Sequence, residues 1–231
     1  MSYRKFERRE IMLKVKICGI KTVDAAIEAD RNGADYIGFI FYRKSSRFVT
    51  PFKAAEIAKS IKCKKVGVFV DESAGVINGI INLVGLDYVQ LHGNEDAKFA
   101  SKIRRVPIIK AWRFNDDLDM RMVNNYPCDM ILLDSFVKGR VGGTGKTFDW
   151  HKASLETRKL TKPFFIAGGI SKQNVQEVVK IFRPYGVDVS GSLEFKGAKS
   201  TNKIREFMDW TNNLRGYVPE PAISDEIVLS Q

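Results

Sequence analysis

The chain is poor in the residues that build disulfide frameworks and metal centres. Its 231 residues include three cysteines and two histidines. No two cysteines form a Cys-x-x-Cys pair, and the odd number favours free thiols in a reducing compartment over disulfides or structural zinc. We therefore expect a cytoplasmic protein without a metal centre.

Long apolar segments are also missing. No apolar run approaches the roughly 18 residues that a membrane-spanning helix needs. No basic stretch followed by an apolar one opens the chain as a secretory signal would. We expect a soluble protein that has no membrane partner.

Positive charge, in contrast, is in excess, with a formal net charge of +11. The basic residues are scattered through the expected helices, as at Lys53, Lys59 and Lys62, without the interleaved aromatic side chains on which nucleic-acid bases stack. We interpret them as a solvated surface, and we expect no nucleic-acid partner. A positive field would also attract a small anionic substrate.

A repeated pattern of short apolar runs and amphipathic segments predicts the fold. The runs are mostly continuous, which is typical of parallel strands covered on both faces. Eight strand and helix units in about 200 residues predict an α/β fold, a (β/α)8 TIM barrel in a single compact domain. A doubly wound open sheet could use the same pattern but more often stops at five or six strands. We expect strands near residues 14–18, 35–41, 65–70, 87–91, 107–112, 129–134, 163–167 and 187–190.

Several helices have recognisable first residues. Thr50 is the expected N-cap of a helix that has Pro51 at its first position. Asn94, which two acidic residues follow, predicts the start of another helix. Ser171 and Ser200 are the expected N-caps of the last two helices.

The two ends of the chain fall outside the repeat. We expect an N-terminal extension over residues 1–12, the barrel over 13–215, and a C-terminal tail over 216–231, where two prolines suggest a loosely docked end.

A thiol and a carboxyl group each close an expected strand. Cys18 ends the first strand, directly before Gly19, and Asp134 ends the sixth. Side chains at these ends line the active-site face of a barrel. A thiolate and a protonated carboxyl group on opposite sides of a bound molecule suit general base and general acid catalysis. The alternative for Asp134 is a carboxylate that caps a loop.

Three glycine-containing loops follow late strands of the expected barrel. Glycine lets the backbone approach an anion closely, and successive N–H groups can hold a phosphate. The loops after strands seven and eight are the usual phosphate site of such barrels, although tight turns also need glycine. The loops are Gly142-Gly143-Thr144-Gly145, Gly168-Gly169 and Ser190-Gly191-Ser192.

Seven short motifs occur in order between residues 13 and 210. They are Lys16-Ile17-Cys18-Gly19-Ile20, Gly38-Phe39-Ile40-Phe41 with Ser45-Ser46-Arg47 and Val49, Gln90-Leu91-His92-Gly93, Leu132-Leu133-Asp134, Gly142-Gly143-Thr144-Gly145 with Phe148-Asp149-Trp150, Ala167-Gly168-Gly169-Ile170, and Asp188-Val189-Ser190. In order and spacing, the chain resembles the phosphoribosylanthranilate isomerase family.

The resemblance implies an activity that needs no cofactor. It is the Amadori rearrangement of tryptophan biosynthesis, which converts N-(5-phosphoribosyl)anthranilate into 1-(o-carboxyphenylamino)-1-deoxyribulose 5-phosphate. By resemblance, Asp134 is the general acid that protonates the ribose ring oxygen and opens the furanose to a Schiff base. Cys18 is the general base that removes the proton from ribose C2, which gives an enolamine that tautomerises to the ketone.

The resemblance also implies substrate-binding residues. Arg47 would hold the anthranilate carboxylate with its fork of donors. Gln90 and His92 would border the substrate, although a structural histidine is the alternative, and Asp188 would help to position the ribose. The phosphate would bind the backbone at Gly168, Gly169, Ser190 and Gly191, with Gly143 nearby.

Two motifs depart from the family pattern. The family commonly has Ser-Pro-Arg where this chain has Ser45-Ser46-Arg47, and Ser-Ser-Gly-Val-Glu where it has Ser190-Gly191-Ser192-Leu193-Glu194. A glycine moved by one place could change which N–H group points at the phosphate.

Other interpretations remain. The related isomerase of histidine biosynthesis has an aspartate where Cys18 stands and two phosphate sites, but the loops after strands three and four lack glycine-rich pairs. His92 and His151 are too few for a metal-dependent sugar-phosphate epimerase. A non-catalytic phosphate-binding barrel would not need both Cys18 and Asp134. We expect a small phosphorylated substrate as the partner, and a monomer or a homodimer.

Overall fold

The computed structural model describes residues 13–103, 106–115, 117–134 and 150–215. The expected N-terminal extension, the C-terminal tail and the loop that contains Gly143 lie outside the described residues.

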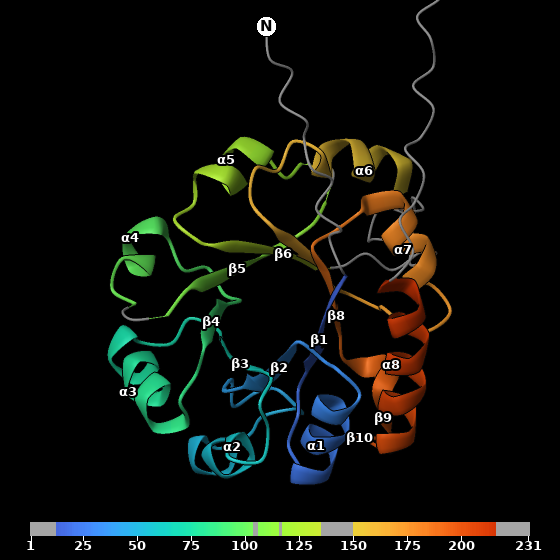
Figure 1. Ribbon diagram of the computed structural model, residues 1–231. Coiled ribbons are helices and arrows are strands. Elements are labelled where there is room, and N and C mark those ends of the chain that lie inside the picture. Colours follow the sequence, from blue (N-terminus) through green and yellow to red (C-terminus); the bar gives the residue numbers. More distant parts are fainter. Residues whose placement is uncertain (1–12, 104–105, 116, 135–149, 216–231) are drawn as a thin grey trace, which may run out of the picture.

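Eight parallel strands form a closed barrel in the order β1 to β8, which confirms the predicted (β/α)8 fold (Figure 1). Every strand lies within about one residue of its predicted limits, because each apolar run is bounded by turn residues. The strands are β1 Lys14–Cys18, β2 Tyr36–Ile40, β3 Lys64–Phe69, β4 Tyr88–Leu91, β5 Ile108–Arg113, β6 Met130–Asp134, β7 Phe164–Ile166 and β8 Gly186–Val189.

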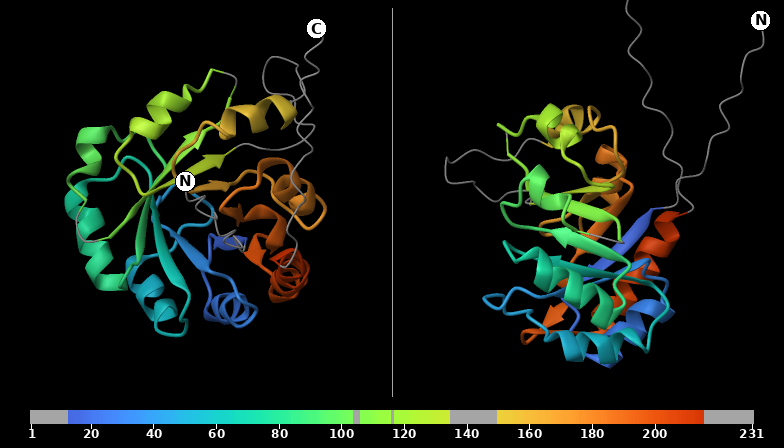
Figure 2. Two further views of the ribbon diagram at one scale, coloured as in Figure 1. Left: turned by 45° about the horizontal axis from the view of Figure 1, so that its top comes forward. Right: turned by 90° about the vertical axis from the view of Figure 1, so that its left-hand side faces the viewer.

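Helices surround the strand ring on its outside (Figures 1 and 2). They are α1 Val23–Arg31, α2 Pro51–Ala58, α3 Ala74–Val84, α4 Ala97–Ala100, α5 Met120–Asn125, α6 Trp150–Thr157, α7 Val175–Phe182 and α8 Thr201–Arg215. A short 3-10 helix, η1 Gly191–Leu193, and a small hairpin, β9 Glu194–Phe195 with β10 Ala198–Lys199, lie between β8 and α8.

Two of the predicted helix starts are confirmed. The Thr50 hydroxyl accepts a hydrogen bond from the Lys53 N–H at 3.3 Å, and Pro51 is the first residue of α2. The Ser200 hydroxyl accepts from the Lys203 N–H at 3.4 Å. Both side chains therefore satisfy backbone donors that a helix start leaves free.

The other two predicted starts are wrong. Helix α4 begins after Asp96, whose carboxylate accepts from the Phe99 N–H at 2.6 Å, and not after Asn94. Helix α7 begins after Asn174, whose amide oxygen accepts from the Ser171 N–H at 2.8 Å. The Asp96 carboxylate thus supplies the cap of α4, two residues after the predicted one. The Asn174 side chain bonds back to Ser171 and caps no helix N–H, and α7 begins three residues later than predicted.

The inside of the barrel is filled at the amino ends of the strands. Tyr36 packs edge to face against Tyr88 and Phe165, with ring centroids 5.5 and 5.4 Å apart. Alternate residues of each strand point inward, and Ile109 and Leu132 close the interior above these rings with no exposed surface. Ligand access is consequently confined to the carboxyl ends of the strands.

Candidate active site

Cys18 and Asp134 both lie at the carboxyl end of the barrel. Cys18 is the last residue of β1 and is 6% exposed. Asp134 is the last residue of β6, and its side chain is 37% exposed. The barrel therefore holds a buried thiol and an accessible carboxyl group at one mouth, as the strand ends predict.

The surroundings of Cys18 are crowded and charged. Its partner on β2 is Gly38, and a Cβ atom placed there would lie 2.8 Å from Cys18 Sγ and 3.1 Å from Lys16 Nζ. Lys16 Nζ donates to Asp188 Oδ1 at 2.9 Å, and both side chains are buried. Gly38 thus leaves the space that the thiol and the ammonium occupy.

The neighbours of Cys18 shift its pKa in opposite directions. Burial raises the pKa of the Cys18 thiol, while the Lys16 ammonium lowers it and the Asp188 carboxylate raises it. Burial also raises the pKa of Asp188, and Lys16 lowers it to a smaller extent. The net effect raises the pKa of Cys18, so a thiolate base has to form by loss of the thiol proton.

Asp134 contacts His92 in the loop after β4, and His92 in turn contacts Gln90 of β4. His92 Nε2 lies 3.4 Å from Asp134 Oδ2, and His92 Nδ1 lies 2.8 Å from the Gln90 amide Nε2. Gln90 is 1% exposed, and its Oε1 has no hydrogen-bond partner in the described part of the chain. His92 is thus held between the carboxyl group and a buried amide.

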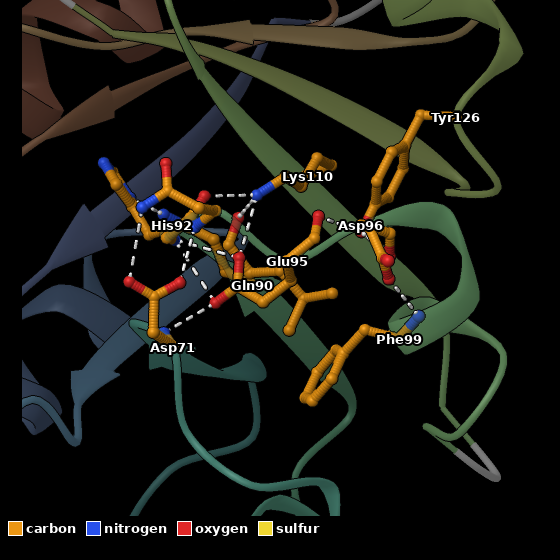
Figure 3. A network of polar contacts seen from close by, with 11 residues as sticks. Asp71, Gln90, His92, Glu95, Asp96, Phe99, Lys110 and Tyr126 are labelled. Carbon is orange, nitrogen blue, oxygen red and sulfur yellow. Dashed lines mark hydrogen bonds and ion pairs between the residues drawn. The ribbon is translucent and has the colours of Figure 1, made fainter.

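A buried ion pair fixes the loop that carries His92 (Figure 3). Lys110 Nζ lies 2.8 Å from Glu95 Oε2 and donates to the Gly93 carbonyl at 2.7 Å. Glu95 Oε1 in turn accepts from the Asp71 N–H at 2.9 Å. The loop after β4 is therefore tied to both β5 and the loop after β3.

A cavity of about 1020 Å³ adjoins the part of the site that contains Asp134. Its described lining includes His92 and Asp134, and it extends over β5 toward Trp112 and Tyr126. Cys18 is not among the described lining residues. The thiol and the carboxyl group thus belong to two neighbouring parts of the mouth, and Asp188 is close enough for the charges of both Asp134 and His92 to act on it.

Arg47 lies on the thiol side, where Glu194 holds it in a two-pronged ion pair. Arg47 Nε donates to Glu194 Oε1 at 2.5 Å and Nη2 to Oε2 at 2.9 Å, and Lys199 Nζ lies 2.7 Å from Oε1. Burial raises the pKa of Glu194, but the hydrogen bonds of Arg47 and Lys199 outweigh it and bring that pKa to about 2. Arg47 also packs over Gly19, whose φ of +81° favours glycine. A substrate carboxylate at Arg47 would have to share the guanidinium group with Glu194 or displace Glu194 from it.

The two described glycine loops lie side by side. Gly168 and Gly169 follow β7 with φ of 84° and 71°, which favour glycine. The Ser192 hydroxyl donates to the Ile170 carbonyl at 2.6 Å, and this joins the loop after β8 to the loop after β7. The Ser190 hydroxyl donates to the Cys18 carbonyl at 3.0 Å. Gly191 and Ser190 therefore sit beside both the other loop and β1.

Three charged residues of this site are absent from the sequence-based predictions. Lys16 could have been predicted, because it lies two residues before Cys18 and strand alternation therefore points both side chains into the barrel. Glu194 ends a motif that departs from the family pattern, but no role followed from it there. Lys199 had no signal, since it belongs to a hairpin that the apolar pattern does not mark.

The described residues contain neither a cluster of metal-binding side chains nor a membrane-spanning helix. No group of three histidine, cysteine, aspartate or glutamate residues in the described ranges is placed to hold a metal ion. No helix among those residues is long and apolar enough to cross a membrane.

Comparison with known proteins gives a consistent result. A family model described as N-(5'phosphoribosyl)anthranilate (PRA) isomerase matches residues 15–210. An N-(5'-phosphoribosyl)anthranilate isomerase of Listeria monocytogenes is 47% identical over 197 residues, which are 84% of this chain and 96% of that protein. A protein of the same name from Bacillus cereus is 42% identical over 200 residues, which are 85% of this chain and 96% of that protein.

Solved structures are similar over almost the same region. A crystal structure of monomers generated from the dimeric phosphoribosylanthranilate isomerase of Thermotoga maritima has a TM-score of 0.77 and 35% identity, and it covers 88% of this chain and 100% of that one. A phosphoribosylanthranilate isomerase in complex with reduced 1-(o-carboxyphenylamino)-1-deoxyribulose 5-phosphate has a TM-score of 0.77 and 34% identity, with the same coverage.

Proposed function

The chain belongs to the phosphoribosylanthranilate isomerase family of tryptophan biosynthesis, and we propose that Cys18 and Asp134 are the base and the acid of its Amadori rearrangement. The substrate is N-(5-phosphoribosyl)anthranilate and the product 1-(o-carboxyphenylamino)-1-deoxyribulose 5-phosphate. The observation that supports these roles is the placement of a thiol and a carboxyl group at the carboxyl ends of β1 and β6, at one mouth of the barrel.

The two groups act one after the other. Asp134 protonates the ribose ring oxygen, and the furanose opens to a Schiff base as Asp134 becomes a carboxylate. The Cys18 thiolate then removes the proton from C2 and becomes a thiol, which leaves an enolamine. The enolamine tautomerises when a proton moves from its O2 to C1. Cys18 then gives its proton to water, and Asp134 takes one up from water. The overall reaction therefore neither consumes nor releases a proton.

The substrate is held by groups on both sides of the mouth. Arg47 binds the anthranilate carboxylate in competition with Glu194, and Asp188 helps to position the ribose. His92 and Gln90 border the substrate on the carboxyl side, where His92 also contacts Asp134. The phosphate binds the backbone of the two joined loops at Gly168, Gly169, Ser190 and Gly191; Gly143, the remaining predicted phosphate-binding residue, lies outside the described residues.

We propose the cytoplasm as the location, because Cys18, Cys63 and Cys128 are all free thiols, which persist in a reducing compartment. The partner is the small phosphorylated substrate, and the protein acts as a monomer or a homodimer. The similar phosphoribosylanthranilate isomerase from Thermotoga maritima is dimeric, which supports the second form.

Turnover of the fluorescent anthranilate substrate tests the assigned roles. Cys18→Ala and Asp134→Asn should each lower kcat by about 10² to 10⁴, the usual contribution of a general acid or base. Cys63→Ala is the matched control, since that thiol lies away from the site, and it should turn over normally. Arg47→Ala should mainly raise KM. Normal turnover by either of the first two variants would contradict the mechanism.

A tryptophan auxotroph that lacks this step tests the reaction as a whole. Expression of the wild-type chain should restore growth without tryptophan, and expression of Cys18→Ala should not. Failure of the folded wild-type protein to restore growth would overturn the proposed function.

A further inference from the structure

A lysine lies inside the barrel next to the proposed base. Lys16 and Cys18 occupy alternate positions of β1, so both side chains point inward. The Lys16 side chain is 0% exposed. A buried ammonium group is very unfavourable unless an anion compensates it, and the reaction described above gives this one no task.

Asp188 is the first compensating group. Strand β8 pairs with β1 so that Asp188 is the direct neighbour of Lys16 across the ladder, and the two side chains meet at 2.9 Å. Burial lowers the pKa of Lys16, but the charges of Asp188 and Cys18 raise it above the ordinary value. Lys16 therefore remains an ammonium despite its complete burial.

The second neighbour is the sulfur of Cys18. Within the described ranges, Asp188 Oδ1 is the only oxygen that accepts from Lys16 Nζ, and an ammonium has three protons to donate. Both Nζ and Sγ adjoin the space that the missing side chain of Gly38 leaves, at 3.1 and 2.8 Å from a Cβ atom placed there, and the charge of a Cys18 thiolate raises the pKa of Lys16. A thiolate accepts such a bond much better than a thiol does.

We propose that Lys16 is a positioning residue for the reaction: its buried ammonium, held in place by Asp188, lies beside the Cys18 sulfur at the space that Gly38 leaves and stabilises the thiolate that removes the C2 proton. This inference rests on the proposed role of Cys18 as the base. Lys16 keeps its own proton throughout. The thiol proton leaves to water, and the C2 proton later takes its place on sulfur.

The other charges near Cys18 have different attachments. Lys199 and Arg47 are cations that also act on the Cys18 thiolate, but both are bound to Glu194. Strand β2 presents only Gly38 to the thiol. Asp188 on β8 is the anion, and it disfavours the thiolate. Lys16 and Asp188 consequently have opposite effects on Cys18, although they form one ion pair.

Because the two residues act in opposite directions, replacing each should shift the titration midpoint of Cys18 in opposite directions. The protein would carry Cys63→Ser and Cys128→Ala, so that ¹³C-labelled cysteine gives a single Cβ signal in the NMR spectrum, whose shift reports thiol or thiolate. Lys16→Met should move the titration midpoint of Cys18 to higher pH than in the parent, and Asp188→Asn should move it to lower pH. At a fixed pH between the midpoints, the thiolate fractions of the two variants should differ about tenfold or more, since one pKa unit is tenfold.

Lys14→Met is the matched control. Lys14 is on the same strand and the same face, and it also binds an aspartate, Asp35, at 2.9 Å, but it lies at the opposite end of the barrel. Its removal should leave the Cys18 midpoint unchanged. Equal midpoints for Lys16→Met and Lys14→Met would overturn the inference. If Lys16→Met does not fold, as circular dichroism would show, an unchanged or raised midpoint in Asp188→Asn overturns it equally.

The titration needs no substrate, so it fails or succeeds separately from the proposed function. Normal turnover by Cys18→Ala would remove the base assignment but leave the midpoints as measured. Midpoints that do not respond to Lys16 would remove this inference and leave the base assignment intact. Each result thus points to one of the two statements.

Discussion

Two lysines of the barrel strands are almost completely buried, yet their surroundings differ in kind. Lys110 of β5 is 3% exposed, and the carbonyls of Leu91 and Gly93 and the carboxylate of Glu95 all accept from it. It faces the helices, on the opposite side of β5 from Ile109 and Ala111. Lys16 of β1 faces the interior, binds one carboxylate and lies beside the thiol of Cys18.

The difference separates a structural ion pair from a functional one. Oxygens surround Lys110, and the rings of Trp112 and Tyr126 lie 5.7 and 5.8 Å from its ammonium. Its charge is thus fully engaged in holding the loop that carries His92. Lys16 lacks such a set within the described part of the chain and shares its charge with a group that can ionise. A buried ammonium that has few hydrogen-bond acceptors around it can stabilise a new anion that forms beside it.

The largest effect should be on stability, and it should be alike for both lysines. Lys16→Met and Lys110→Met each leave a carboxylate buried without its partner, so each should lower the free energy of unfolding by about 3 to 5 kcal/mol. Urea denaturation of the two variants measures this. For Lys110→Met, adding Glu95→Gln should recover part of the loss, since an amide needs no counter-charge. A loss below about 1 kcal/mol in either single variant would contradict the view that both pairs are buried.

Catalysis should separate the two lysines. Lys16→Met should lower kcat/KM by about a hundredfold, because the thiolate of Cys18 loses its cation, a loss within the range of general base catalysis. Lys110→Met should lower it less than about tenfold, through the looser loop that carries His92. Steady-state kinetics on protein shown to be folded would measure both. Equal losses would make Lys16 a structural residue like Lys110.

A third ion pair, between Arg47 and Glu194, is partly exposed and should contribute less. The folded pKa of Glu194, about 2, lies below its ordinary 4.5, so its stabilisation is present above pH 4.5 and is lost as the pH falls toward 2. Glu194→Gln should cost about 1 to 2 kcal/mol at pH 7, less than the full pKa difference because water screens the Arg47 side chain. The cost should shrink below pH 4.5. Urea denaturation at pH 7 and pH 3.5 measures it, and an equal cost at both pH values would contradict the assignment.

The smallest effect should come from the pair of Lys14 and Asp35. These side chains are 32% and 19% exposed, and exposed pairs contribute about 1 kcal/mol or less. Lys14→Met should therefore change both the unfolding free energy and kcat/KM only slightly. A large loss of activity in this variant would show that removal of any lysine from β1 disturbs the site.

Much of this architecture could be predicted from the sequence because its signals are local. Each strand is a continuous apolar run, and a strand end fixes the height of Cys18 and of Asp134 in the barrel. The neighbouring positions of the loops at Gly168 and Ser190 follow from their strand order alone. The predicted start at Asn94 is wrong because Asp96 caps that helix two residues later, and the start at Ser171 is wrong because Asn174 bonds back to Ser171 before the helix begins.

The ion pairs could not be predicted because they depend on contacts between distant segments. Lys16 and Asp188 are 172 positions apart and meet only when β8 closes the barrel against β1 in one register. Glu95 reads as a first-turn acid of a helix, whereas it is a buried partner of Lys110. Sequence patterns give the side of a strand on which a charge lies, but the closing register decides its partner.

The pH dependence of kcat/KM tests the central claim most directly. In the wild type, activity should rise with pH as Cys18 loses its proton. The account predicts that this rising limb moves to higher pH in Lys16→Met and to lower pH in Asp188→Asn, whatever the maximal rates are, because the two residues act on the Cys18 thiolate with opposite sign. A limb at the same pH in all three proteins would contradict it.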